Sequence, residues 1–252
     1  MKECVLITGA AKNTGKVIAQ LFAQKGYNVI LTARKLEDAK VCANEIALKT
    51  KTTVIGMAFN QGQTESIVPL FKKIEKQGFV VSKLIMNAAA QGLDCDPLNV
   101  SEEDWSSVIN TNVIGGFLCA RESARQMLKH NIKGSILFIG SNTAYHAIRK
   151  RSSYIASKGA IASMVKALTL DFGEYGIRVN CLMPGPIHTD RWETLTEEQV
   201  AFRRNRAPLK KEAQAIDIAN AVYFLSSEMS ANTTGAELII DGGMHVQLHP
   251  NM

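Results

Sequence analysis

Short β-branched runs alternate with helix-length amphipathic stretches along the whole chain of 252 residues. The runs predict seven strands, at Cys4–Thr8, Asn28–Ala33, Val54–Ala58, Lys83–Met86, Ser135–Ile139, Arg178–Met183 and Glu237–Ile240. Helical patterns lie between them, at Gly15–Gln24, Leu36–Lys49, Thr64–Gln77, Ser101–His130, Tyr154–Tyr175 and Ala213–Ser226. Nearly continuous apolar strands are typical of a parallel sheet that is covered on both faces. We therefore predict one doubly wound α/β domain over residues 1–252, with a central, mostly parallel seven-stranded sheet.

The composition disfavours a membrane, secreted or metal-binding protein. The chain is 46% apolar and 21% charged, and it contains no run of about 18 apolar residues that would predict a membrane span. Met1 leads almost directly into the first strand, which leaves no room for a signal peptide. The five cysteines have no metal-site spacing, which predicts reduced thiols, no metal and a cytoplasmic protein. A net charge of +6 suits an anionic ligand, but the chain has no nucleic-acid motif.

A glycine-containing loop, Thr8–Gly15, follows the first strand and opens the first helix. This order is typical of dinucleotide sites, where one glycine allows a tight turn and another lets the helix approach the strand. The free N–H groups of the helix N-terminus then face the pyrophosphate. Asn13 replaces the middle glycine, but asparagine tolerates a positive φ better than most residues. The residues expected to contact the cofactor here are Gly9, Lys12, Asn13, Thr14 and Gly15.

The end of the second strand carries a clue to cofactor choice. NAD sites place an acidic residue about 20 positions after the glycine loop, whereas this chain has Arg34 and Lys35 there. The planar guanidinium of Arg34 suits a 2′-phosphate, and Lys12 offers a second positive charge. We therefore predict NADP (NADPH) rather than NAD. The alternative is that both cations are merely solvated.

Tyr154 and Lys158 are four residues apart in a predicted helix, so their side chains share one face. A phenol has an ordinary pKa of about 10, and a neighbouring ammonium group favours its ionised form. Such a pair can deliver a proton to a carbonyl oxygen or remove one from an alcohol. The spacing also occurs by chance on solvated helices, so its interpretation depends on the other motifs.

Together these motifs resemble the short-chain dehydrogenase/reductase family over nearly the whole chain. The matches occur in the family's order, at Thr8–Gly15, Asn87–Ala89, Asn112, Ser141, Tyr154 with Lys158, Pro184–Gly185 and Asp241–Gly243. The resemblance implies a Rossmann fold and an NAD(P)-dependent enzyme that interconverts a carbonyl and a secondary alcohol by hydride transfer. It also implies a homotetramer or homodimer.

The resemblance also implies residue roles. Tyr154 would be the general acid or base, Lys158 would support it and hold the nicotinamide ribose, and Ser141 would stabilise the developing alkoxide. Asn112 would hold a water molecule that relays protons from Lys158. Further cofactor contacts are implied at Asn60, Asn87, Ala88, Tyr154, Lys158, Pro184, Gly185, Ile187 and Thr189. Each could instead be structural, with Ser141 and Thr189 as caps and Asn112 as a core hydrogen-bonding residue.

A few positions depart from the family's pattern. Asn13 replaces a glycine, Met86 and Ala89 alter the usual Asn-Asn-Ala-Gly, and Asn60 stands where an aspartate often contacts adenine. The amide oxygen of Asn60 can still accept a hydrogen bond. These differences bear on cofactor affinity rather than on the chemistry.

The alternation of strands and helices is interrupted between Pro184 and about Lys211. An insertion after a strand's C-terminal end borders the ligand crevice of a doubly wound sheet, so we predict a substrate lid near residues 186–211. The segment 142–151 and this lid are both basic, which favours an anionic or polyhydroxylated small-molecule substrate, although a solvated or subunit-facing charge run is the plainer interpretation. The lid cations are Arg203, Arg204, Arg206, Lys210 and Lys211.

Other functions remain open at this stage. A 3-oxoacyl-carrier-protein reductase is one alternative, but the acidic run Asp171–Tyr175 disfavours docking of an acidic carrier. A sugar or polyol dehydrogenase is another. A non-catalytic dinucleotide sensor would be expected to lose Ser141, Tyr154 or Lys158, and all three are present. The tail after Gly243 could reach a neighbouring subunit or could be frayed.

Overall fold

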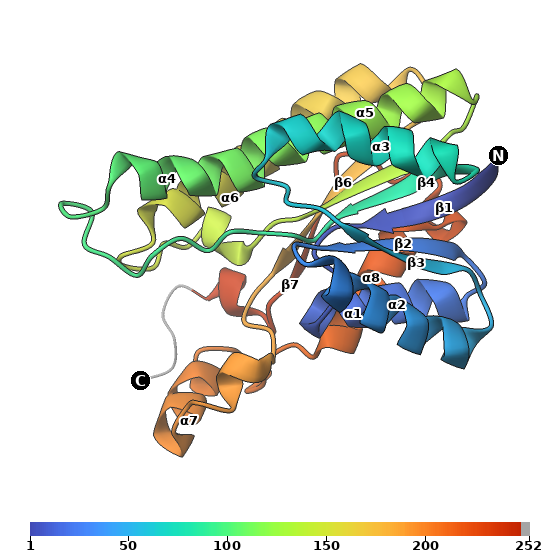
Figure 1. Cartoon of the computed structure of the whole chain (residues 1–252). Helices are drawn as coiled ribbons and strands as arrows, with labels where there is room; N and C mark the ends of the chain where they lie inside the picture. The colour runs from blue at the N-terminus through green and yellow to red at the C-terminus, as the bar shows by residue number, and fades with distance from the viewer. Residues whose placement is uncertain (248–252) are drawn as a thin grey trace.

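Seven parallel strands form the centre of the computed structural model, which describes residues 1–247 (Figure 1). In chain order they are β1 Lys2–Ile7, β2 Asn28–Ala33, β3 Val54–Ala58, β4 Phe79–Met86, β5 Ser135–Ile139, β6 Arg178–Pro184 and β7 Glu237–Ile240. Their order across the sheet is β3-β2-β1-β4-β5-β6-β7, and every pair is parallel. This topology confirms the predicted doubly wound sheet. The chain reverses its direction of winding between β1 and β4, where such sheets place their ligands.

Helices cover both faces of the sheet (Figure 1). On one face α1 Asn13–Gln24, α2 Leu36–Thr50 and α8 Ala215–Ser226 contribute to one apolar cluster. On the other face α3 Ile67–Lys76, α5 Gly115–Lys129 and α6 Ser152–Gly173 contribute to a second cluster. Two further helices, α4 Glu102–Ile109 and α7 Glu197–Asn205, extend beyond these layers. Both faces are therefore covered, as the apolar strands predicted.

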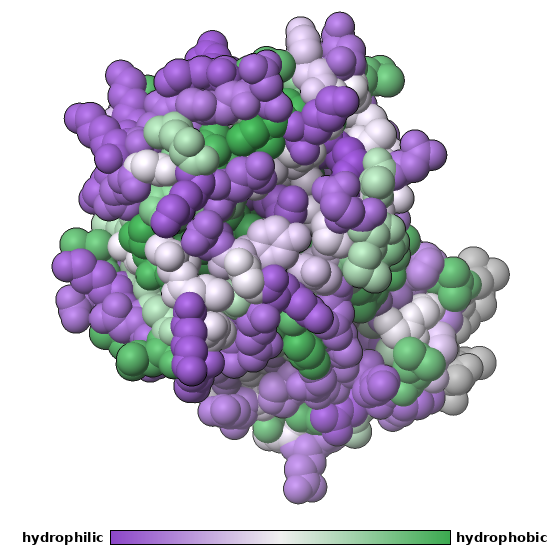
Figure 2. Space-filling model, turned by 90° about the vertical axis from the view of Figure 1, so that its right-hand side faces the viewer, coloured by the Kyte–Doolittle hydropathy of each residue, from purple (hydrophilic) through white to green (hydrophobic). Residues whose placement is uncertain are grey.

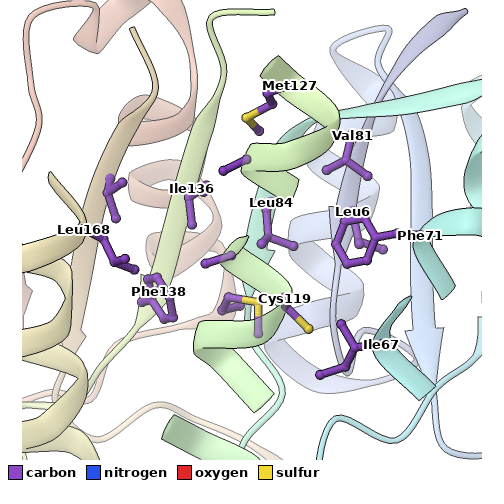
Figure 3. Packing of buried hydrophobic residues seen from close by; sticks show 14 of the residues in the cluster. Leu6, Ile67, Phe71, Val81, Leu84, Cys119, Met127, Ile136, Phe138 and Leu168 are labelled. Atoms are coloured by element: carbon purple, nitrogen blue, oxygen red, sulfur yellow. The ribbon is translucent and has the colours of Figure 1, made fainter. Parts of the chain in front are cut away.

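The second cluster shows how the strands and helices are joined (Figure 3). Leu6 and Leu84 project from neighbouring strands and are fully buried. Phe71 of α3 and Cys119 of α5 pack against this surface. Burial of one leucine side chain contributes about 1.5–3 kcal/mol. The central strands are thus held from both sides, and their C-terminal ends form a firm base for the loops.

Most predicted element boundaries agree with the structure to within two residues, but one strand is longer. β4 begins at Phe79 rather than at Lys83, and all eight of its residues are buried. Lys83 is inside this strand, with its Nζ 5.5 Å from the ring centroid of Tyr27. The polar residues Ser82 and Lys83 divided the apolar run in the sequence, so the prediction began too late.

Two helical predictions need larger corrections. The predicted helix Ser101–His130 consists of α4 and α5 joined by a π-helical turn at Asn110–Ile114. The segment 186–211 contains α7, which was not predicted because none of its residues is buried and it has no apolar stripe. Its start is nevertheless marked by a capping box, in which Thr196 and Gln199 exchange hydrogen bonds.

Among the described residues, no helix has both the length and the apolar character that crossing a membrane requires. The face shown in Figure 2 is mostly hydrophilic, with hydrophobic residues in small groups. Such scattered apolar residues are normal on folded domains.

Candidate active site

A cleft of about 1870 Å³ runs along the C-terminal ends of the strands. Its walls come from the segments that follow β1 to β6, together with parts of α4, α6 and the segment 186–211. Every residue that the sequence predicted as a cofactor contact lines this cleft, as do Ser141, Tyr154 and Lys158. Of the predicted site residues, Asn112 is the exception. The structure thus gathers residues from six loops into one site.

The glycine loop after β1 requires its glycines for close packing. Gly9 has a φ of 62°, and a Cβ there would lie 2.9 Å from Cα of Ala88. A Cβ on Gly15 would lie 2.7 Å from Cα of Ala10 and from Nδ2 of Asn87. These distances are too short for a side chain, so the loop can follow this path only with glycine at both positions.

Asn87 connects the glycine loop to β4. Its Nδ2 donates to the carbonyl oxygens of Thr8 at 3.0 Å and of Gly9 at 2.8 Å. The backbone N–H of Ala88 donates in turn to Oγ1 of Thr8. These bonds join the two central strands at the point where they end, so the first turn of α1 has a fixed position relative to the sheet.

Asn13 adopts the left-handed conformation that the sequence predicted, with a φ of 50°. When its amide is oriented by its neighbours, Nδ2 donates to the Asp190 carboxylate at 2.9 Å. This bond reaches across the cleft from the glycine loop to the segment 186–211. Lys12 occupies the N-cap of α1 without a side-chain capping bond, so the amides of the first turn remain available.

At the far end of the cleft, Arg34 and Lys35 follow β2 and are exposed. Lys16 lies nearby but forms an ion pair with Glu45, so part of its charge is compensated. Within residues 1–247, neither Arg34 nor Lys12 forms an ion pair. The two cations that the sequence singled out for a 2′-phosphate are therefore not compensated by a carboxylate of the described chain, and the same holds for Lys35.

Tyr154 and Lys158 lie one turn apart near the start of α6. The Lys158 Nζ is 5.5 Å from the centroid of the Tyr154 ring and donates to the carbonyl oxygen of Ile139 at 2.8 Å. Only 3% of Lys158 is exposed. The bond to the end of β5 holds the ammonium group beside the phenol ring in a largely dry environment, where its charge acts more strongly than in water.

Ser141 follows β5 and has two structural features that bear on its role. Its Oγ accepts a bond from the backbone N–H of Thr143 at 3.2 Å, so it caps a short 3₁₀ turn as the alternative interpretation anticipated. Its O–H donor has no partner within the described residues, while the side chain lines the cleft. The cap fixes the oxygen, and the hydroxyl hydrogen remains available to a ligand.

Asn112 lies behind the cleft wall, and all three bonds of its amide are internal. Oδ1 accepts from the N–H of Ala90 at 2.7 Å, and Nδ2 donates to the Ala90 carbonyl oxygen and to Oγ of Ser157. Ser157 Oγ donates to the carbonyl oxygen of Tyr154. The side chain thus ties the loop after β4 to α6. Its expected part in a proton relay stays a prediction.

The π-helical turn around Asn112 depends on a residue that the sequence reasoning missed. Gln61 is 4% exposed, and its Nε2 donates to the carbonyl oxygen of Thr111 at 2.8 Å. A Cβ on Gly115 would lie 2.2 Å from the Gln61 carbonyl oxygen. π-Helical turns occur often at functional sites. The pair Gly115–Gly116 inside a predicted helix was the available signal.

The segment 186–211 is anchored by a buried carboxylate. Glu212 accepts bonds from Nε and Nη2 of Arg204 at 2.7 and 2.8 Å and shares a bond with Nδ1 of His188 at 3.0 Å. The Arg204 guanidinium lowers the pKa of Glu212 to about 2. His188 stacks on Trp192 with ring centroids 5.7 Å apart, and Trp192 lines the cleft. Arg204, predicted as a substrate-facing cation, is therefore occupied by this ion pair.

The fold and the lining of the cleft are those of a dinucleotide-dependent oxidoreductase. Comparisons with known proteins identify the family. Residues 9–245 match a family described as enoyl-(acyl carrier protein) reductase. The chain is 34% identical over 248 residues to 3-oxoacyl-[acyl-carrier-protein] reductase of Rattus norvegicus, covering 98% of this chain and 99% of that one. It is 31% identical over 243 residues to glucose 1-dehydrogenase 2 of Bacillus subtilis, covering 96% and 94%.

A solved structure, described as a proposed gluconate dehydrogenase from Agrobacterium tumefaciens, superimposes with a TM-score of 0.92 at 27% identity. The match covers 98% of this chain and 97% of that one. The chain belongs to the short-chain dehydrogenase/reductase family, whose members are NAD(P)-dependent oxidoreductases.

Proposed function

We propose that this protein is an NADPH-dependent reductase that interconverts a small carbonyl compound and the corresponding secondary alcohol. The observation that carries the proposal is the position of Ser141, Tyr154 and Lys158 in the same cleft as the glycine loop. We also propose that residues 1–252 act as one domain, that residues 186–211 form its lid, and that the protein works in the cytoplasm as a homotetramer or homodimer.

The residues of the cleft fit a dinucleotide. Gly9 and Gly15 let the loop pack against Ala88 and Ala10 in the tight turn that dinucleotide sites use, and the uncapped amides at the start of α1 suit a pyrophosphate. Arg34 would hold a 2′-phosphate through charge-assisted hydrogen bonds, with Lys12 as a second cation. The bound cofactor would supply the hydride. Other contacts are proposed for Asn60 at the adenine and for Ile187 and Thr189 at the nicotinamide.

Side chains of the protein would transfer the proton and stabilise the negative charge that develops on the carbonyl oxygen. The Tyr154 hydroxyl would give its proton to the carbonyl oxygen, with the Lys158 ammonium group favouring the ionised phenol that remains. The free O–H of Ser141 would donate to the same oxygen as negative charge develops there. In alcohol oxidation the same groups would act in reverse.

Two substrate alternatives follow from the relatives' names. The rat relative is named as a 3-oxoacyl-[acyl-carrier-protein] reductase, but Asp171 and Glu174 are exposed near the end of α6 and would repel an acidic carrier. The Bacillus relative is named as a glucose dehydrogenase, which favours a polyhydroxylated substrate. We place an anionic or polyhydroxylated small molecule first, since the cleft is lined by cations and hydrogen-bonding groups.

The substitution Tyr154→Phe tests whether Tyr154 is the proton donor, and Tyr175→Phe is the matched control. Tyr175 lies beyond the end of α6 and does not line the cleft. Loss of a general acid costs about 10²- to 10⁴-fold in rate, so we expect Tyr154→Phe to lower kcat by that amount and to leave the Kd for NADPH within about twofold. NADPH oxidation with a panel of carbonyl compounds gives the rate, and fluorescence titration gives the Kd. A Tyr154→Phe protein with full turnover would show that another group delivers the proton.

A further inference from the structure

Two arginines of the segment 186–211 line the cleft without a carboxylate partner. Arg191 and Arg203 both belong to the segment 186–211 and line the cleft. Arg204, the next residue, is bound by Glu212 through two hydrogen bonds. Within residues 1–247, neither Arg191 nor Arg203 forms an ion pair. The segment therefore compensates one guanidinium and leaves two positive groups facing the substrate space.

The Arg203 guanidinium packs on a buried aromatic ring. Its guanidinium carbon lies 5.5 Å from the ring centroid of Trp192, and Trp192 is only 6% exposed. The indole Nε1 donates to the carbonyl oxygen of Ile187 at 2.8 Å, which fixes the ring. A guanidinium that packs on an aromatic face keeps the N–H groups at its edge available for a planar acceptor.

Arg191 bridges the two walls of the cleft. Its Nη1 donates to Oε1 of Gln91, which belongs to the loop after β4. The backbone carbonyl oxygen of Gln91 accepts a bond from Arg151, and the preceding residue, Ala90, is held by Asn112. Since Asn112 also bonds Ser157 on the catalytic helix, the bridge is tied to the part of the cleft where Tyr154 lies.

The acceptor in this bridge is a neutral amide, and a carboxylate binds a guanidinium more strongly in a bidentate geometry. Asp190 and Glu103 also line the cleft. Asp190 faces Asn13 of the glycine loop, and Glu103 of α4 makes no ion pair with either arginine. A substrate carboxylate would thus meet two guanidinium groups whose charge no side-chain carboxylate compensates.

We propose that Arg191 and Arg203 bind a carboxylate of the substrate, so that the protein reduces an oxo acid to a hydroxy acid. This inference rests on the proposed function. In the reaction the carbonyl carbon gains a hydride from NADPH and the carbonyl oxygen gains a proton from Tyr154. The products are the hydroxy acid and NADP⁺, and the carboxylate takes no part in the bond changes. Gln91 would release Arg191 as the acid enters.

The experiment compares oxo acids of three to six carbons with their neutral methyl esters. One charge-assisted pair contributes about 1.5–3 kcal/mol, which corresponds to about 10- to 100-fold in affinity. We therefore expect kcat/KM to favour the preferred acid over its ester by about that factor. Arg191→Gln and Arg203→Gln should each lower the ratio of acid to ester about tenfold. Arg206→Gln is the control, because Arg206 does not line the cleft and packs on Phe202.

A binding measurement separates this inference from the proposed function. The chain has two tryptophans, so Trp105→Phe leaves Trp192 as the sole reporter beneath Arg203. Titration of that protein with a non-reacting hydroxy acid should quench its fluorescence, and added Arg191→Gln should weaken the effect about tenfold. Reduction of esters and acids at equal efficiency would overturn the carboxylate site and leave the reductase intact. Acid binding through Arg191 without reduction of any carbonyl would support the site and overturn the function, and absence of both would overturn both.

Discussion

The two ends of the cleft, proposed above to bind the cofactor and the substrate, are held in place by different kinds of contact. At the cofactor end, the glycine loop depends on the backbone of Gly9 and Gly15 and on the bonds from Asn87 to backbone carbonyls. At the substrate end, the segment 186–211 depends on side chains, chiefly the cluster of Glu212, Arg204 and His188. A backbone surface suits a ligand common to many enzymes, whereas side chains can vary with the substrate. The comparison predicts that substitutions at the two ends will have separable effects on cofactor and substrate binding.

Among substitutions that test this comparison, Gly15→Ala should have the largest effect on NADPH binding. Its new Cβ would lie 2.7 Å from three heavy atoms of the glycine loop and Asn87. Overpacking of this kind costs about 1–3 kcal/mol, so the Kd for NADPH should rise about 10- to 100-fold. Gly173→Ala is the control, since its Cβ would meet nothing within 4 Å. Calorimetric titration measures both, and an unchanged Kd in Gly15→Ala would mean that the loop is not held by backbone packing.

Arg34→Asp tests whether a single side chain sets cofactor choice within this backbone-built end. Loss of a charge-assisted bond to the 2′-phosphate costs about 1.5–3 kcal/mol, so the ratio of kcat/KM for NADPH to that for NADH should fall about 10- to 100-fold. Lys40→Asp is the control, because it makes the same charge change on α2, the helix that follows Arg34, but outside the cleft. If both variants keep the wild-type ratio of kcat/KM for NADPH to kcat/KM for NADH, Arg34 does not contact the 2′-phosphate.

At the substrate end, Glu212→Gln should raise KM for the carbonyl several-fold and leave the Kd for NADPH unchanged. The amide replaces a carboxylate that binds Arg204 and His188, and bonds to charged groups contribute about 1.5–3 kcal/mol each. Glu193→Gln is the control, because Glu193 is exposed and forms no ion pair within the described chain. A parallel rise in the NADPH Kd would contradict the separation of the two ends.

The same carboxylate predicts a pH effect. The pKa of Glu212 is lowered from 4.5 to about 2 by Arg204, so its contribution to stability is complete above pH 4.5 and is lost as the pH falls toward 2. Hydrogen exchange in residues 186–211 should therefore quicken over this range in the wild type. The change should be smaller in Glu212→Gln, which has no carboxyl group to protonate.

The smallest effect on NADPH binding is expected for Asn13→Gly. Glycine adopts the observed φ of 50° without strain, but the bond to Asp190 across the cleft is lost. These effects oppose each other, so the Kd for NADPH should stay within about threefold. Asn131→Gly is the control for backbone strain alone, since Asn131 has a φ of 54° outside the cleft. A larger change would show that Asn13 takes part in holding the cofactor.

The sequence predicted the backbone-built end better than the side-chain end, for physical reasons. Gly9 and Gly15 stand out because only glycine permits their geometry, and Tyr154 with Lys158 stands out because helical spacing places both on one face. Arg191 and Gln91 are one hundred positions apart, and nothing local indicates that they meet. The polar helix α7 lacked the apolar period that marks a buried face. The proposed cofactor contacts follow from local sequence patterns, whereas the proposed substrate contacts depend on tertiary structure.

The π-helical turn has a consequence for how this enzyme could be altered. Gln61, beside the proposed adenine contact Asn60, supports the turn through Thr111, and Asn112 within the turn binds Ser157 of α6. Ser157 donates in turn to the backbone carbonyl oxygen of Tyr154, so amide and hydroxyl groups extend from the neighbour of Asn60 to the backbone of the proposed proton donor. A substitution at Gln61 would therefore weaken the support of α6 near Tyr154, whereas substitutions in the glycine loop and in the segment 186–211 would not act through these bonds.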